Sequence, residues 1–150
     1  MTIALPKLIA IDYDGYHADL VGKTSDGRQF FITTPFEALR PGNEFVALFL
    51  FDPAGKFLEA FIDEFGPRAT MDHDARDAMI QQRVDQLGEF SLERIEIAPF
   101  QVEKFGTQFG LIPNEREEDE DEDDYRLTIS LMPGDYMAFS EPWDSGEYDT

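Results

Sequence analysis

The sequence predicts an α+β fold, in which a mostly antiparallel, strongly bent β-sheet is built from hairpins and accompanied by one principal helix at about 72–87. Two observations lead to this prediction. Short apolar segments separated by turn residues fill much of the chain, as in strands that pair with their sequence neighbours. The segment 72–87 instead combines capping residues with apolar residues at helical spacing.

The first expected hairpin lies near the N-terminus. Segments 16–22 and 29–34 flank a Ser-Asp-Gly sequence at 25–27. Asp-Gly favours the tight turns that join antiparallel strands, because glycine adopts a positive φ without steric cost. We therefore expect these two segments to pair with each other.

The second expected hairpin is the clearest in the chain. Segments 45–51 and 56–62 flank Asp-Pro-Ala-Gly at 52–55, where Pro presets the turn and Gly permits a positive φ. The first of these segments, FVALFLF, is apolar at every position. Such a strand is typical of the middle of a sheet that is covered on both faces.

The principal helix is expected to begin at a cap and end at a glycine. Thr70 or Asp72 supplies the N-terminal cap, and the acidic residues that follow suit the positive end of the helix dipole. Ile80, Val84 and Leu87 fall on one helical face, and a glycine comes directly after them. We expect this face to lie on one side of the sheet.

Strands resume after the helix. Segment 91–97 is expected to form one strand, and 100–104 and 108–112 to form a third hairpin around Phe-Gly-Thr at 105–107. Segment 125–131 is expected to be the next strand. The whole chain, 1–150, is of the size of a single domain.

A block of like charge separates the last two of these strands. EREEDEDEDD spans 115–124, and it has no glycine to fold around an ion and no neutral ligand. Because carboxylates repel one another, we expect an acidic flexible loop at 113–124 rather than a defined cation site. Deletion of residues 117–123 is expected to leave the fold intact.

The composition excludes several classes of function. The chain has no cysteine, which removes disulfides, thiolate metal sites and thiol catalysis. Its 32 acidic residues against 12 Lys and Arg, a net charge of −20, disfavour nucleic acid and anionic membranes as partners and favour a basic protein. Neither a signal peptide nor a membrane helix is recognisable. We expect a cytoplasmic protein.

Motifs for catalysis and cofactor binding fail on their spacing. Gly-Lys-Thr at 22–24 lacks the glycine that a phosphate-binding loop needs at position 17, which is His17. His73 and Asp77 share a helical face, but two ligands do not make a structural zinc site. We therefore expect no catalytic residue, no cofactor and no metal.

The C-terminal segment is rich in aromatic residues among acids. Candidate partner-binding residues there are Tyr136, Trp143, Asp144 and Tyr148, because aromatic side chains are enriched at protein interfaces. The alternative, which we favour, is that the aromatic rings fold back and close the core.

Four segments form a recognisable series along the chain. They are GRQFFITTPF at 27–36, ALFLFDPAGKFLEA at 47–60, IAPFQVEKFGTQFGLI at 97–112 and FSEPWDSGEYDT at 139–150. In this order they resemble segments of small bacterial proteins labelled formate hydrogenlyase regulatory protein. The resemblance implies a bacterial regulator rather than an enzyme, with no catalytic residues to carry over. The ending departs from the family pattern EPWDG-x-YDT at Ser145.

Three functions remain open from the sequence. The first is a non-enzymatic protein-binding or regulatory module, which the acidity and the resemblance favour. The second is an immunity protein that neutralises a basic toxin, because such proteins are small and acidic. The third is a carboxylate-dependent or cation-dependent hydrolase, which needs a pocket where acids or a histidine converge.

Overall fold

The computed structural model describes residues 6–14, 19–37, 42–67, 69–113, 128–133, 137–140, 142–143 and 146–148. Within these residues the strands form a six-stranded, a five-stranded and a two-stranded sheet, accompanied by one helix. Every strand pairing is antiparallel. The predicted α+β class is confirmed. The expectation of a single sheet is wrong, because the described strands form three sheets.

The six-stranded sheet, called the central sheet below, is organised around one strand. Its members are β2 (Val21–Thr24), β3 (Gln29–Thr33), β4 (Phe36–Glu37), β5 (Asn43–Phe51), β6 (Phe57–Gly66) and β7 (Phe90–Leu92). β5 pairs with β3 and β4 along one side and with β6 along the other. β6, β7 and the short β4 each pair with one neighbour only among the described strands, so each has an open side.

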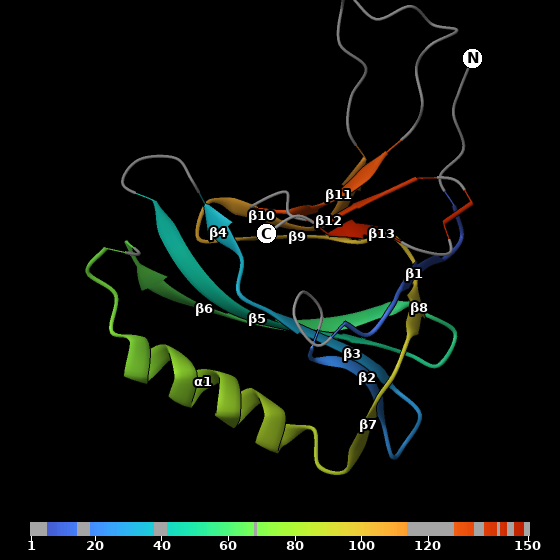
Figure 1. The fold of residues 1–150 in the computed structure, drawn as a ribbon, viewed down its shortest axis with the longest axis horizontal. Helices are drawn as coiled ribbons and strands as arrows, with labels where there is room; N and C mark the ends of the chain where they lie inside the picture. The colour runs from blue at the N-terminus through green and yellow to red at the C-terminus, as the bar shows by residue number, and fades with distance from the viewer. Residues whose placement is uncertain are drawn as a thin grey trace, which may run out of the picture.

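The five-stranded sheet, called the outer sheet, comes from the second half of the chain. Its strands lie side by side in the order in which they occur along the chain: β9 (Gln101–Lys104), β10 (Thr107–Pro113), β11 (Ile129–Met132), β12 (Met137–Phe139) and β13 (Gly146–Tyr148). The two-stranded sheet pairs β1 (Ile9–Ile11) with β8 (Ile95–Ile97). Figure 1 shows the outer sheet above the central sheet, with the helix on the opposite side.

The main core fills the space between the two large sheets. Phe45, Ala47, Phe49 and Phe51 of β5 face it, and side chains of the outer sheet and of β1 and β8 complete it. The residues between them, such as Leu48 and Leu50, point to the other side of the central sheet. The uninterrupted apolar sequence of β5 is explained by this arrangement, because a pleated strand presents alternate side chains to opposite faces and both faces are buried.

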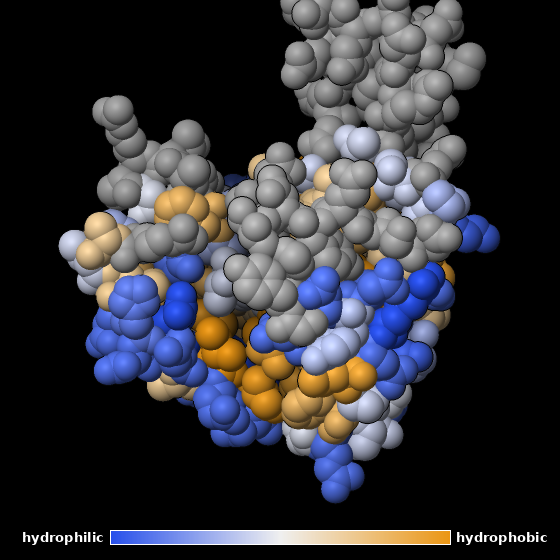
Figure 2. Space-filling view, in the orientation of Figure 1, coloured by the Kyte–Doolittle hydropathy of each residue, from blue (hydrophilic) through white to orange (hydrophobic). Residues whose placement is uncertain are grey.

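The helix α1 (His73–Gln86) covers the second face of the central sheet. A smaller core there contains Phe30, Ile32, Leu48 and Leu50 from the strands and Leu87 from the end of the helix, with Val84 packed against it. No residue within α1 itself is fully buried. Figure 2 shows hydrophobic side chains near the middle of the face turned to the viewer, next to hydrophilic ones.

The ends of α1 agree with the sequence. The side chain of Asp72 accepts a hydrogen bond of 3.0 Å from the amide of Ala75, so Asp72 is the cap. Thr70 is not the cap, because its hydroxyl donates to the carbonyl of Pro67. Gly88 has φ +72°, the left-handed conformation that ends many helices.

The expected strand at 91–97 is wrong. Phe90–Leu92 pairs with β2 in the central sheet, whereas Ile95–Ile97 pairs with β1. Glu93 and Arg94 lie between the two strands. A period-two pattern fixes which side chains share a face, but it does not fix which neighbour a strand pairs with.

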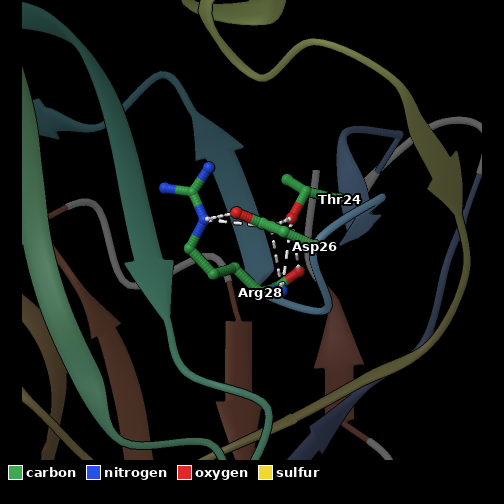
Figure 3. A network of polar contacts seen from close by, with 3 residues as sticks. All are labelled: Thr24, Asp26 and Arg28. Atoms are coloured by element: carbon green, nitrogen blue, oxygen red, sulfur yellow. Dashed lines mark hydrogen bonds and ion pairs between the residues drawn. The ribbon is translucent and has the colours of Figure 1, made fainter.

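The turn between β2 and β3 is held by its own side chains (Figure 3). The Asp26 carboxylate accepts hydrogen bonds from the Thr24 hydroxyl and from Nε of Arg28, the latter at 3.0 Å. These bonds, that from Thr24 above all, lower the pKa of Asp26 below its ordinary value. The cluster stabilises a turn that the sequence already predicts, so we assign it a structural role.

The acidic loop predicted at 113–124 lies outside the described residues apart from Pro113, which ends β10. The strands on either side of it are neighbours, since Pro113 is opposite Ile129 in the register of β10 and β11.

Candidate functional site

A groove opens at one end of the molecule, where the edge strands of the two large sheets begin. It has a volume of about 520 Å³, which is within the range of ligand sites. The described residues that line it are Lys7, Leu8, Ala54, Lys56, Phe57, Ala98, Pro99, Phe100 and Gln101. Phe57 is the first residue of β6 and Gln101 the first of β9, so we call this site the edge groove.

One wall of the edge groove is the turn between β5 and β6. The Asp52 carboxylate accepts hydrogen bonds of 2.9 Å from the amides of Ala54 and Lys56, which fixes the turn and the start of β6. Gly55 adopts φ +96°, and its carbonyl accepts a hydrogen bond of 2.9 Å from the amide of Ala98. The turn is thereby tied to the opposite wall.

The opposite wall follows β8 and is held by a buried amide. The side chain of Gln29, on β3, donates to the carbonyl of Glu96 and accepts from its amide, each at 2.8 Å. Gln29 also donates to the carbonyl of Asp52 at 3.3 Å. One side chain therefore joins the central sheet, β8 and the turn, and a buried amide so satisfied makes the two walls rigid with respect to each other.

The floor of the edge groove is aromatic. The rings of Phe57 and Phe100 stack at 5.1 Å, and behind them Phe100 meets the rings of Phe49 and Phe51 at 4.8 and 5.1 Å. Phe100 is buried and Phe57 half-buried. The groove therefore exposes one face of a rigid aromatic cluster, and aromatic faces are strong anchors for apolar ligand groups.

Two lysines, Lys7 and Lys56, line the groove together with this apolar floor. Among the Lys and Arg that the structure describes, Lys23, Arg28, Arg76, Arg83 and Arg94 each have a carboxylate within 4.0 Å. Within the described part of the chain, Lys7, Lys56 and Lys104 have no carboxylate at this distance; Lys104 lies over the ring of Phe105, whereas Lys7 and Lys56 line the groove. Unpaired cations beside an apolar surface form an environment for a ligand that has both an anionic and an apolar part.

The partner-binding residues predicted from the C-terminal segment are described only in part. Tyr136 and Asp144 lie outside the described residues, and Tyr148 is described by its backbone alone, in β13 opposite Met137. Trp143 packs against the main core, and its carbonyl accepts a hydrogen bond of 2.9 Å from the amide of Ala10. Trp143 thus closes the core, as we favoured, while a binding role for these four residues stays a prediction.

His73 and Asp77 belong to no larger cluster of metal-binding side chains among the described residues. His73 is exposed at the start of α1, and the Asp77 carboxylate pairs with Arg76, whose Nη2 is 3.1 Å from it. Within the described residues there is no group of three or more His, Asp and Glu that could hold an ion. His17, the other histidine, lies outside them.

Sequence reasoning missed the edge groove. Phe57 and Phe100 read as ordinary core residues, and Lys7 and Lys56 read as solvated surface, because they are far apart along the chain. The signal that could have indicated the groove was Gln29, a polar residue at the start of β3 that is buried and is followed by three apolar residues. Such a residue often marks a place where distant backbone segments meet.

No family model, curated protein or solved structure matches this chain. The resemblance to proteins labelled formate hydrogenlyase regulatory protein therefore stays a prediction. Within the described residues, α1 is neither long nor apolar enough to cross a membrane.

Proposed function

We propose that this protein is a non-enzymatic, cytoplasmic binding module and that the edge groove is its recognition site. The observation that carries the proposal is the placement of Lys7 and Lys56, without recorded carboxylate partners, at the rim of the Phe57–Phe100 floor. The ligand group that fits is a carboxylate attached to an apolar body. Its charge is met by the ammonium groups and its apolar part by the rings.

The chemistry of the lining supports binding rather than turnover. The hydrolase considered from the sequence would need a carboxylate or a histidine beside the bound ligand. The described lining offers apolar groups, two lysines and a glutamine. The hydrolase that we considered from the sequence gains no support from these residues.

A titration with phenylpropionate, followed by NMR chemical shifts, tests this proposal. We expect saturable shifts at Phe57, Ala98 and Gln101, and much smaller ones with phenylpropanol, which has no charge. Lys7→Gln with Lys56→Gln should abolish the difference between the two probes. The control is Lys23→Gln, whose lysine lies on β2 with Glu93 at 3.5 Å and away from the groove. Equal shifts from both probes in the wild-type protein would refute carboxylate recognition.

Neutralisation of a basic toxin is a second candidate, and the net charge of −20 supports it. Its first test is genetic context. The gene beside this one should encode a secreted toxin, and co-expression of this chain should protect cells from it. A neighbouring gene of another kind, or cells that stay sensitive, would remove this candidate.

A further inference from the structure

We infer that the natural ligand of the edge groove is the free C-terminal segment of a partner protein, which extends the central sheet as a new strand beside β6. The inference rests on the proposed function, because it identifies the carboxylate that the groove binds as a chain terminus. Four features of the described residues lead to it: an open strand edge, its direction, its regular stretch and its charges.

The first feature is the edge of β6. This strand of ten residues pairs with β5 on one side only. In the part of the chain that the structure describes, no strand pairs with its other side, and several of its side chains are exposed. An edge of this length offers a row of backbone donors and acceptors, which an extended peptide can satisfy by strand addition.

The second feature is direction. β6 begins at Phe57, in the edge groove, and runs away from it to Gly66. A strand added antiparallel to β6 therefore ends beside Phe57, where Lys7 and Lys56 line the groove. Its terminal carboxylate would meet both ammonium groups, and its last side chain would cover the Phe57–Phe100 floor. A parallel strand would instead bring a positively charged amino terminus to two lysines, which is unfavourable.

The third feature is a bulge that separates the groove from the regular edge. Phe51 is opposite Phe57 and Leu50 is opposite Glu59, so Leu58 has no partner residue. A bulge bends a strand and redirects its side chains, and such bulges often border binding sites. The register is regular again from Glu59 to Glu64, which gives a straight stretch for pairing. The bulge at Leu58 separates this stretch from Phe57, which belongs to the aromatic floor of the edge groove.

The fourth feature is the charge along β6. Glu59 and Glu64 are exposed on its two faces, since Glu59 shares the face of Phe61 and Glu64 that of Ile62. Opposite charges on neighbouring strands stabilise their pairing, and like charges oppose it. The favoured peptide therefore has basic residues upstream and an apolar residue at its end. Such a peptide would place its basic residues beside the acidic side chains of β6 and its terminal carboxylate beside the lysines of the groove.

Fluorescence anisotropy with labelled peptides tests the inference. The reference peptide has lysines upstream, phenylalanine at its end and a free carboxylate. We expect its affinity to fall about tenfold or more when the terminus is amidated, because a charge-assisted contact is lost. Lys56→Gln and Lys7→Gln should each weaken the free acid and leave the amidated peptide unchanged. Lys23→Gln should change neither, and circular dichroism should show all variants folded.

A second measurement separates this inference from the proposed function. With the free-acid peptide, NMR shifts should extend along the β6 amides from Glu59 to Glu64, whereas phenylpropionate should shift only groove residues. Groove shifts from phenylpropionate, together with equal affinities for the free and amidated peptides, would overturn the inference and leave the proposed function standing. No shift from either probe would overturn both.

Discussion

The rings of Phe57 and Phe100 stack with their centroids 5.1 Å apart and their planes 12° from parallel. Phe57 begins the edge strand of one sheet, and Phe100 directly precedes the edge strand of the other. This pair therefore fixes the distance between the two sheets at the place where the edge groove opens. The stability of the sandwich and the shape of the site depend on the same contact.

Phe100→Ala is expected to lower the free energy of unfolding by about 3 to 5 kcal/mol, because the side chain is buried and meets three other rings. Denaturant unfolding measures this loss. Leu58→Ala is the matched control, since Leu58 lies next to Phe57 but is 48% exposed. Its effect should stay within about 0.5 kcal/mol. Similar losses from the two variants would show that Phe100 is not a core residue.

Gly55→Ala is expected to destabilise the protein much more than Gly66→Ala. Both glycines have a positive φ, of 96° and 74°, so both variants carry the cost of a left-handed alanine, about 1 kcal/mol. Only at Gly55 would the new Cβ lie 2.6 Å from the carbonyl oxygen of Glu96, a backbone atom that cannot move away freely. At Gly66 the Cβ meets nothing within 4 Å.

Thermal midpoints of the two glycine variants measure this difference. Because the turn at Gly55 forms a wall of the edge groove, Gly55→Ala should also weaken phenylpropionate binding, while Gly66→Ala should not. Equal midpoints would mean that the turn and β8 do not approach each other as closely as the structure shows.

Asp26→Asn is expected to lower the thermal midpoint near neutral pH, with an effect that disappears in acid. Hydrogen bonds from Thr24 and Arg28 hold the pKa of the Asp26 carboxyl below its ordinary value in the folded state. The unfolded state therefore binds a proton more readily than the folded state. The resulting stabilisation is fully present above the ordinary Asp value, about 3.9, and is lost as pH falls through the lower folded pKa.

Thermal melts of wild type and Asp26→Asn across this acid range measure the effect, with the exposed Glu103→Gln as control. The wild-type and Asp26→Asn curves should converge toward low pH. A constant gap at all pH values would attribute the effect to the shape of the side chain rather than its charge.

Deletion of residues 117–123 is expected to leave the thermal transition cooperative and its midpoint close to that of the full chain. The strands on either side of the deletion are already opposed, at Pro113 and Ile129, so a shorter connection still joins them. Loop-closure entropy changes only slowly with length, by about 0.6 kcal/mol per doubling. Loss of the transition would show that the acidic segment contributes to the folded core.

The sequence determined most of the local structure of this protein. The turns after β2 and β5, the cap at Asp72 and the glycine after Leu87 depend on the backbone preferences of a few neighbouring residues. The apolar run of β5 likewise predicted its place in the middle of a sheet, because only a strand buried on both faces needs apolar residues at every position.

Tertiary structure alone decided how these elements combine. Whether Ile95–Ile97 continues β7 or pairs with β1, and whether the strands form one sheet or several, depends on long-range pairing that no local pattern encodes. The edge groove is a product of that pairing. Lys7, Lys56 and Phe100 come from three distant segments, and they meet because Gln29 and Gly55 join the turn of the central sheet to β8.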